Sequence, residues 1–346
     1  MPVPPEGSPP EESIEELCAM RLRFFSEALS SFQASSSKFR VICTAPPVIC
    51  FRVPGSRKRE DHCPSPPIPP REPPKSLVVL DSSFNPPTHA HGIMARSAVF
   101  DLPGTPRILL VLSVNNADKA PKPASFEQRL SMMWSFARDV QVLLSVGQRG
   151  GEIGVDGISV DIALSTLPYF HAKSQAIAED DFYQGGLSGE WSGRLRERPR
   201  LQNTADQDQE PPTKQVILVG YDTVIRLFDL KYYQTEEGNG IQRALGPLFD
   251  RATLRVTMRP DDEWGTISEQ KQYVKSLFKP RKMVELGLDK SWESKIELVQ
   301  DSRGWSKGVS STYARNAAKE GDQEAMKKMI PRRVVEWIQS ERLYRE

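Results

Sequence analysis

The segment LVVLDSSFNPPTHAH, residues 77–91, decides the class of fold. It opens with four apolar residues, which is typical of a buried strand in a parallel sheet. Pro86 and Pro87 then favour a turn, and a helical pattern begins near His89. A strand, a turn and a helix in this order are the first unit of a parallel α/β fold, and the free N–H groups that start such a helix attract phosphate. The segment therefore predicts a phosphate or nucleotide site behind its strand.

Two side chains of this segment are suited to act on a phosphoryl group. Thr88 supplies a hydroxyl and His91 an imidazole, and their spacing of three residues places both on one face of the predicted helix. Hydrogen-bond donors in such positions stabilise the charge that develops on a phosphoryl group in the transition state. Thr88 and His91 are therefore candidate catalytic residues.

Beyond Lys75 the chain alternates strand and helix patterns, which predicts a parallel α/β sheet. Strands are predicted at 77–81, 108–114, 158–164, 216–220, 254–258 and 296–299. Helices are predicted at 89–100, 125–144, 222–230, 241–249 and 268–278, and the end of the chain is helical in pattern at 312–320, 322–329 and 331–341. Residues 184–213 interrupt the alternation with Gly, Ser, Arg, Gln and Pro, and are either a mobile lid or a solvated insertion; their few apolar anchors favour the insertion.

The N-terminal quarter has a different composition, because roughly half of the 29 prolines precede Lys75. Apolar spacing predicts an amphipathic helix at 14–32 and a short strand at 39–43. The sequence leaves open whether this helix packs on the rest of the protein or binds a partner. The predicted organisation is an N-terminal extension at 1–53 with one helix and a short strand, a Pro-rich linker at 54–75, and a main domain at 76–346 that carries a flexible insertion at about 184–213.

Bulk properties argue against several classes of protein. A formal net charge of +1 argues against broad electrostatic binding to nucleic acid, so any anion site must be local. No apolar run is long enough to span a bilayer, and the first thirty residues lack a signal peptide pattern, so we expect an intracellular, cytoplasmic or nuclear protein without membrane contact. All four cysteines, Cys18, Cys43, Cys50 and Cys63, precede residue 64 at spacings that match no zinc pattern, so reduced thiols and no protein-bound metal are expected.

The segment GVSSTYAR, residues 308–315, is a second candidate for phosphate binding. Ser310, Ser311 and Thr312 at the start of a predicted helix are good N-caps and need no ligand for that role. Arg315, however, places a cation near the positive end of the helix dipole. A bound polyphosphate would remove this conflict.

Further candidates follow other predicted strands. Gly220 and Asp222 lie at the carboxyl end of one strand, where ligands of open α/β sheets gather, although Asp222 alone could cap the next helix. Arg259 ends the following strand and either serves the same edge or is an exposed surface residue. Lys119 and Lys122 lie in a polar loop, as a solvated pair or as phosphate ligands.

These motifs resemble those of the nicotinamide mononucleotide adenylyltransferase family of nucleotidyltransferases, and specifically its fungal branch. That family carries a glycine, a small hydroxyl residue and Phe-Asn-Pro-x-Thr-x-x-His after its first strand, and Ser-x-Thr-x-x-Arg near its end. The matching residues here are Ser83, Phe84, Asn85, Pro86, Thr88, His91, Ser310, Thr312 and Arg315, with Ser82 in the place of the glycine. The resemblance covers approximately residues 76–342.

The resemblance implies a Rossmann-like doubly wound parallel sheet of the nucleotidyltransferase type, with a C-terminal helical segment and an N-terminal helical extension. It implies that both motifs hold the phosphates of ATP, with Arg315 as a catalytic residue beside Thr88 and His91. It also implies that Gly220 and Asp222 hold the nucleotide sugar and that Lys119 or Lys122 contacts phosphate. The implied reaction is adenylyl transfer from ATP to the 5′-phosphate of nicotinamide or nicotinic acid mononucleotide by direct in-line displacement. It gives NAD, or its acid form, and pyrophosphate, with Mg²⁺ carried on the triphosphate.

The fungal branch also has a Phe-x-x-Lys element, matched by Phe170 and Lys173, whereas many relatives stack the pyridine ring on a tryptophan motif nearby. No such tryptophan pattern is present here, so Tyr169 and Phe170 either stack on a base or pack internally.

Two other functions stay open at this point. Cytidylyltransferases that act on a phospho-alcohol favour Phe-Asp, His-x-x-His and Gly-Ile-Ser-Thr-Thr, so Asn85, Thr88 and Arg315 favour the adenylyl branch. Ser82 in place of glycine keeps a nucleotide-binding regulatory protein as the second alternative. The sequence contains no P-loop, no serine nucleophile elbow and no paired-histidine zinc motif, so those enzyme classes are disfavoured.

Overall fold

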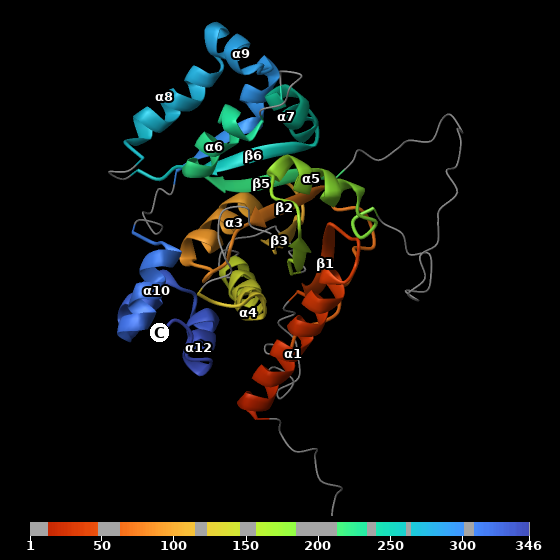
Figure 1. Ribbon diagram of the computed structural model, residues 1–346, viewed down its shortest axis with the longest axis vertical. Coiled ribbons are helices and arrows are strands. Elements are labelled where there is room, and N and C mark those ends of the chain that lie inside the picture. Colours follow the sequence, from red (N-terminus) through yellow and green to blue (C-terminus); the bar gives the residue numbers. More distant parts are fainter. Residues whose placement is uncertain are drawn as a thin grey trace, which may run out of the picture.

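A seven-stranded sheet lies at the centre of the molecule (Figure 1), with the strand order β1-β4-β3-β2-β5-β6-β7. The computed structural model describes residues 13–47, 63–114, 123–145, 157–184, 213–233, 240–260, 264–300 and 308–345. The strands are β1 (Phe39–Ala45), β2 (Ser76–Asp81), β3 (Arg107–Ser113), β4 (Val160–Ser165), β5 (Lys214–Gly220), β6 (Ala252–Thr257) and β7 (Ile296–Val299). Neighbouring strands are parallel, except that β1 runs antiparallel to β4.

The order of the strands confirms the predicted doubly wound fold. From β2 the chain moves outward to β3 and β4, returns to β5 on the other side of β2, and continues to β6 and β7. This path creates a topological switch point between β2 and β5. Open sheets of this kind bind ligands there, beyond the carboxyl ends of the strands.

Helices cover both faces of the sheet because alternate strand residues point to opposite sides. Val78 and Leu80 of β2 join one core cluster with the N-terminal and C-terminal helices, and Leu77 and Val79 join the other. The first face carries α1 (Ile14–Gln33), α3 (His89–Asp101), α4 (Phe126–Ser145), α10 (Ser311–Glu320), α11 (Gln323–Met329) and α12 (Arg332–Ser340). The second carries α5 (Phe170–Glu179), α6 (Tyr221–Leu227), α7 (Gly240–Arg251), α8 (Ile267–Leu277) and α9 (Pro280–Leu286), with short 3₁₀ turns η2 (Leu230–Tyr232) and η3 (Lys290–Lys295).

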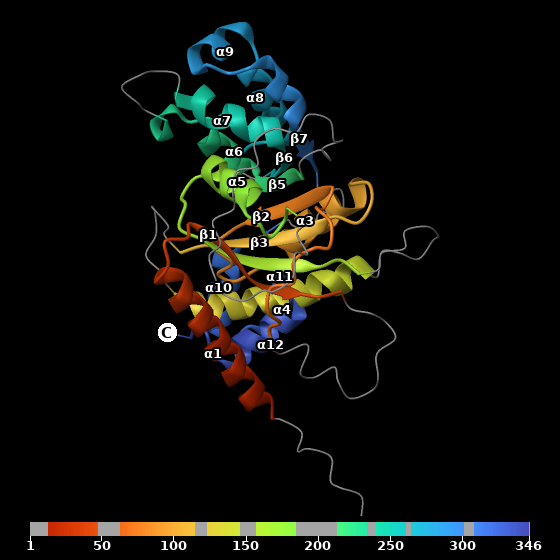
Figure 2. The same ribbon diagram turned by 90° about the vertical axis from the view of Figure 1, so that its right-hand side faces the viewer.

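The N-terminal helix packs on the core rather than standing free. Both α1 and α12 contact α4 (Figure 2), and β1 extends the sheet. Arg21 of α1 is buried, donates a hydrogen bond to Ser135 Oγ at 2.9 Å, and places its guanidinium 4.6 Å from the ring centre of Trp337. One side chain thus joins three helices. The predicted domain boundaries at 53 and 75 stay a prediction.

The sequence prediction missed two helices, α5 and α9. Most of the predicted insertion at 184–213 falls outside the described residues, as do Cys50, Lys119 and Lys122. Cys18, Cys43 and Cys63 are free thiols. Within the described parts of the chain, every helix is too short or too polar to cross a membrane.

Candidate functional site

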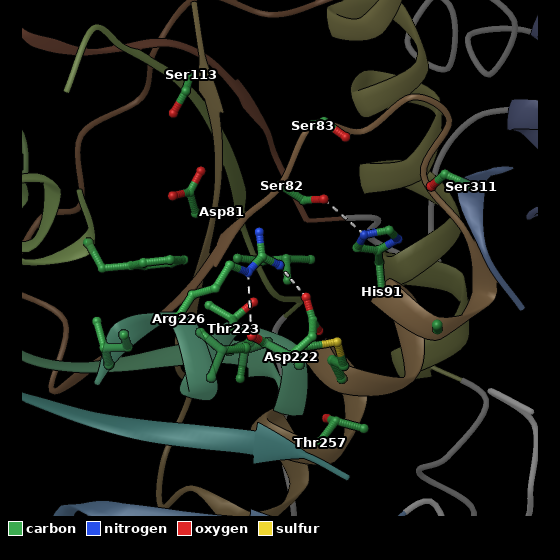
Figure 3. Close-up of a pocket in the computed structure, with 18 of the residues that line it drawn as sticks. Asp81, Ser82, Ser83, His91, Ser113, Asp222, Thr223, Arg226, Thr257 and Ser311 are labelled. Atoms are coloured by element: carbon green, nitrogen blue, oxygen red, sulfur yellow. Dashed lines mark hydrogen bonds and ion pairs between the residues drawn. The ribbon is translucent and has the colours of Figure 1, made fainter. Parts of the chain in front are cut away.

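A cavity of about 680 Å³ opens at the carboxyl ends of the central strands (Figure 3). Its wall contains Asp81 at the end of β2, the next two residues, Gly220 at the end of β5 and Thr257 at the end of β6. The first turns of α3 and α10 and the start of α5 complete it. The cavity lies at the switch point of the sheet and has the volume of a small-molecule site.

His91 lies on the cavity wall and uses both ring nitrogens. Thr88 is the N-cap of α3, and its backbone N–H donates to His91 Nδ1 at 3.0 Å. The Thr88 hydroxyl is 2.9 Å from the same nitrogen, and Ser82 Oγ is 3.1 Å from Nε2 (Figure 3). Because Nδ1 accepts a backbone N–H, the proton of the neutral ring is on Nε2. The capping geometry of the helix thus fixes the tautomer of the imidazole.

The environment also fixes the charge of His91. Withdrawal from solvent lowers its pKa from 6.5 to about 4, so the ring is neutral at pH 7. Phe84 and Phe136 supply the apolar contacts, with ring centres 5.6 Å and 6.3 Å from the imidazole. His91 therefore presents an N–H donor rather than a cation.

The two predicted phosphate-binding segments are hydrogen-bonded to each other although they lie far apart in the chain. Ser311 Oγ donates to the carbonyl of Pro86 at 2.8 Å, 225 residues away. Arg315 donates to the carbonyl of Asn85 at 2.8 Å, 230 residues away, and to Thr312 Oγ1 at 3.2 Å. The start of α10 is thereby held against the turn that precedes α3.

Phe84 and Asn85 shape this turn from inside the protein. Phe84 has a positive φ of 46° and is fully buried. Asn85 is 5% exposed, and its Oδ1 accepts the hydroxyl of Tyr344 at 2.7 Å. Neither side chain lines the cavity. Both predicted binding residues hold the turn in place, and contact with a ligand stays a prediction for them.

Gly220 and Asp222 lie where the sequence predicted, on the cavity wall at the end of β5 and in the first turn of α6. A Cβ on residue 220 would come within 2.6 Å of Asp222 Oδ1, so any larger residue would displace this carboxylate. Asp222 forms an ion pair with Arg226, and both side chains are partly exposed (Figure 3). The carboxylate is therefore accessible to a ligand from the cavity.

The other predicted residues divide between the cavity and its surroundings. Ser83, Arg259, Ser310 and Ser311 line the cavity, whereas Thr312 and Arg315 do not. Ser310 is the N-cap of α10 and accepts the N–H of Tyr313 at 3.1 Å, so the capping role is present. Lys119 and Lys122 lie outside the described residues.

Sequence reasoning missed a buried ion pair in the wall. Lys173 of α5 pairs with Asp81 at the end of β2, and each side chain is 8% exposed. The Phe-x-x-Lys spacing marked Lys173, but nothing in the sequence links it to Asp81, 92 residues away. Ser113 ends β3 beside this pair, and its buried hydroxyl has no hydrogen-bond partner among the described residues (Figure 3).

Arg129 of α4 is a further candidate in the wall, and none of the sequence motifs includes it. It is 6% exposed, lines the cavity and donates to the carbonyl of Ala124 at 3.0 Å. Burial lowers its pKa, and the charge of nearby Arg315 lowers it further. Arg129 therefore adds a positive charge to the cavity wall.

Magnesium fits this site as a companion of phosphate. Two carboxylates of the cavity wall, Asp81 and Asp222, are each paired with a cation. Among the described residues no group of three or more His, Cys, Asp or Glu could hold a metal. Mg²⁺ keeps several waters and binds phosphate oxygens readily, so a triphosphate would supply its ligands.

Two solved structures of Plasmodium falciparum nicotinic acid mononucleotide adenylyltransferase are similar to this chain. The form complexed with NaAD is 16% identical, with a TM-score of 0.44, over 78% of this chain and 97% of that one. The form complexed with APC is 15% identical, with a TM-score of 0.43 and the same coverage. At these TM-scores the likeness adds nothing to the assignment of a family.

The assignment comes from the amino-acid sequence. No family model matches the chain. A curated protein of Schizosaccharomyces pombe, named "Putative nicotinamide mononucleotide adenylyltransferase", is 31% identical over 271 residues, which cover 78% of this chain and 87% of that protein. With this relative, the doubly wound sheet and the joined motifs, the chain belongs to the nicotinamide mononucleotide adenylyltransferase family and is a nucleotidyltransferase.

Proposed function

We propose that the protein transfers the adenylyl group of ATP to the 5′-phosphate of nicotinamide or nicotinic acid mononucleotide. The products are NAD, or its acid form, and pyrophosphate. The observation that carries the proposal is the direct hydrogen bonding of the Ser311–Arg315 segment to the carbonyls of Asn85 and Pro86, beside a cavity at the switch point. The relative from Schizosaccharomyces pombe supports the choice of acceptor.

The reaction needs no covalent enzyme intermediate. An oxygen of the mononucleotide 5′-phosphate forms a bond to the α-phosphorus of ATP, while the bond from that phosphorus to the β-phosphate bridging oxygen breaks. Pyrophosphate leaves with the electron pair. The attacking phosphate is already ionised at neutral pH, so no general base is required. The protein contributes position and charge stabilisation.

His91 supplies a neutral donor on the wall of the proposed phosphate site. Thr88 holds the ring through Nδ1 and acts through His91 in this arrangement. Ser83, Ser310, Ser311 and the amides that start α10 face or border the triphosphate, with Arg315 and Arg129 as nearby positive charges. Lys119 or Lys122 contacts a phosphate, as the family motif implies. When bound to the triphosphate, Mg²⁺ would supply further neutralisation of the charge on pyrophosphate.

The acceptor occupies the side of the cavity next to α5. Tyr169 lines the cavity and stacks on His171, with ring centres 5.5 Å apart and planes inclined by 8°. Tyr169 is 42% exposed and lines the cavity, so we expect its aromatic ring to serve the pyridine ring where other relatives use tryptophan. Gly220, Asp222 and Arg259, which line the same cavity, serve a nucleotide sugar.

A matrix of nucleotides and acceptors tests this function. Purified protein with Mg²⁺ is incubated with ATP or CTP and with nicotinamide mononucleotide, nicotinic acid mononucleotide or phosphocholine, and both dinucleotide and pyrophosphate are measured. We expect product from ATP with a pyridine mononucleotide. Product from CTP and phosphocholine alone would make the protein a cytidylyltransferase. Binding of ATP without any product would make it a nucleotide-binding regulatory protein.

A further inference from the structure

The residue in the place of the family glycine contacts the catalytic candidate directly. Ser82 follows β2, and its backbone N–H bonds to the carbonyl of Val111 at 3.4 Å, so its position is set by the neighbouring strand. Its Oγ lies 3.1 Å from His91 Nε2, and the side chain lines the cavity (Figure 3). A glycine could make no such contact.

The direction of this hydrogen bond follows from the other side of the ring. His91 Nδ1 accepts the backbone N–H of Thr88, so the Nε2–H is the donor and Ser82 Oγ is the acceptor. The hydroxyl proton of Ser82 is then free. Among the described residues, His91 is the hydrogen-bond partner of Ser82 Oγ, and the hydroxyl borders the open cavity.

We propose that Ser82 is a catalytic residue that relays the donor capacity of His91: Nε2–H donates to Ser82 Oγ, and the Ser82 O–H donates to a non-bridging oxygen of the phosphoryl group in transfer. No proton changes hands, and the imidazole stays neutral throughout. Accepting a hydrogen bond makes a hydroxyl a stronger donor, so His91 and Ser82 act as one unit. This inference rests on the proposed adenylyl transfer and adds the group that touches the phosphate.

Two other roles for Ser82 make different predictions. If Ser82 only fills the position of the glycine, its hydroxyl is dispensable and His91 reaches the phosphate alone. If Ser82 instead holds the imidazole away from the substrate, removal of the hydroxyl speeds the reaction. A relay requires the hydroxyl, and it makes the effects of the two residues overlap.

The test compares Ser82→Gly, Ser82→Ala, Ser82→Thr and His91→Ala with the double variant Ser82→Ala/His91→Ala. Dinucleotide formation by the unchanged protein is measured first, because its absence would defeat the proposed function and leave Ser82 out of the question. Glycine is the residue of the family motif, so Ser82→Gly is the variant safest for folding. Thermal unfolding and ATP binding are recorded for every variant.

A relay predicts that Ser82→Gly and Ser82→Ala both lower kcat by about a hundredfold, the usual loss for one transition-state donor, with KM for ATP changed little. Ser82→Thr, which keeps a hydroxyl, retains kcat within about threefold. The kcat of the double variant lies within about threefold of that of the slower single variant. Full or increased activity in Ser82→Gly overturns the relay. Losses that multiply in the double variant overturn it as well, because they show two independent donors.

Discussion

Two buried ion pairs lie at opposite ends of the strands of the same sheet, one at the amino edge and one at the carboxyl edge. They differ in the groups that surround them. Asp161, near the start of β4, accepts hydrogen bonds from Arg107 at 2.5 Å and 2.8 Å, from Thr44 at 2.7 Å and from Tyr183 at 2.9 Å. Asp81, at the carboxyl end of β2, pairs with Lys173 on the wall of the cavity.

The two carboxylates differ in whether any of their surroundings remain open to a ligand. The amino-edge carboxylate is fully enclosed and has donors from three parts of the chain, so no group is left for a ligand. The carboxyl-edge pair borders open space, beside the unpartnered hydroxyl of Ser113. A closed network stabilises the fold, whereas a pair on a cavity wall can exchange partners when a phosphate arrives.

The largest effect on stability is expected for Arg107→Met. It leaves the Asp161 carboxylate buried without its cation, which should lower the free energy of unfolding by about 3–5 kcal/mol. Urea unfolding measures the change. Tyr183→Phe is the milder companion and should cost about 1 kcal/mol, since it removes one hydrogen bond. Folded Arg107→Met protein should keep its kcat; a large fall in kcat at unchanged stability would contradict a structural role for this edge.

His91→Ala, at the carboxyl edge, should lower activity rather than stability. Removal of a transition-state donor lowers kcat by about 10²–10³-fold, with a small loss of stability. Steady-state kinetics with ATP and the mononucleotide measure the loss. His89→Ala is the matched control, because His89 bonds instead to the carbonyl of Lys327 and does not line the cavity. Equal losses in the two variants would refute a catalytic role for His91.

Lys173→Met removes the cation of the carboxyl-edge pair, as Arg107→Met does at the amino edge. Asp81 borders the cavity, so water can solvate the freed carboxylate and the loss of stability should be the smaller one. The expected main effect is on binding, with KM for the mononucleotide raised about tenfold, or about 1.4 kcal/mol. A loss of stability as large as that of Arg107→Met, with KM unchanged, would make the two edges equivalent.

The stability of the protein should depend on pH through His91 at the carboxyl edge. The pKa of His91 falls from 6.5 to about 4 on folding, because burial disfavours the charged ring. The unfolded chain therefore binds the extra proton first, and the contribution of His91 to stability is complete above pH 6.5 and is lost as the pH falls toward about 4. His91→Gln should flatten this slope in urea unfolding at a series of pH values. An identical slope in the variant would exclude His91 as its source.

Tyr344→Phe should give the smallest effect, about 1 kcal/mol of stability, through loss of the hydrogen bond to Asn85 Oδ1. Thermal unfolding measures it. Tyr313→Phe is the control, because Tyr313 is 58% exposed and contributes only its backbone N–H to the cap of α10. A larger change in the control would show that the turn at Asn85 does not depend on Tyr344.

Local patterns in the sequence were enough to predict the strands of the sheet. Each of the seven strands was predicted to within two residues at either end, because each is an apolar run bounded by turn residues. Helix α9 was missed although its ends carry ordinary signals, a proline in the first turn and Gly287 in the left-handed conformation after the last. That helix could have been found.

The rest depended on contacts between distant segments. The burial of Arg129 could not be predicted from its helix alone, because an ordinary helix has a polar face, whereas α4 is covered by both α1 and α12, so most of its residues are buried. Helix α5 was missed because it is short and directs the charged Lys173 inward, toward a carboxylate 92 residues earlier. The motifs predicted which residues meet at the switch point, and only the fold shows which of them face the cavity.

The bonds from the C-terminal helices to the turn at Asn85 have a consequence for how the protein is made. The turn is synthesised early, but its two carbonyls and one side-chain oxygen await Ser311, Arg315 and Tyr344. A growing chain that has already formed its central strands therefore still lacks the groups that set this turn. Activity should emerge only after Ser311, Arg315 and Tyr344 have left the ribosome, so a chain truncated before residue 311 is expected to be inactive even where its sheet has formed.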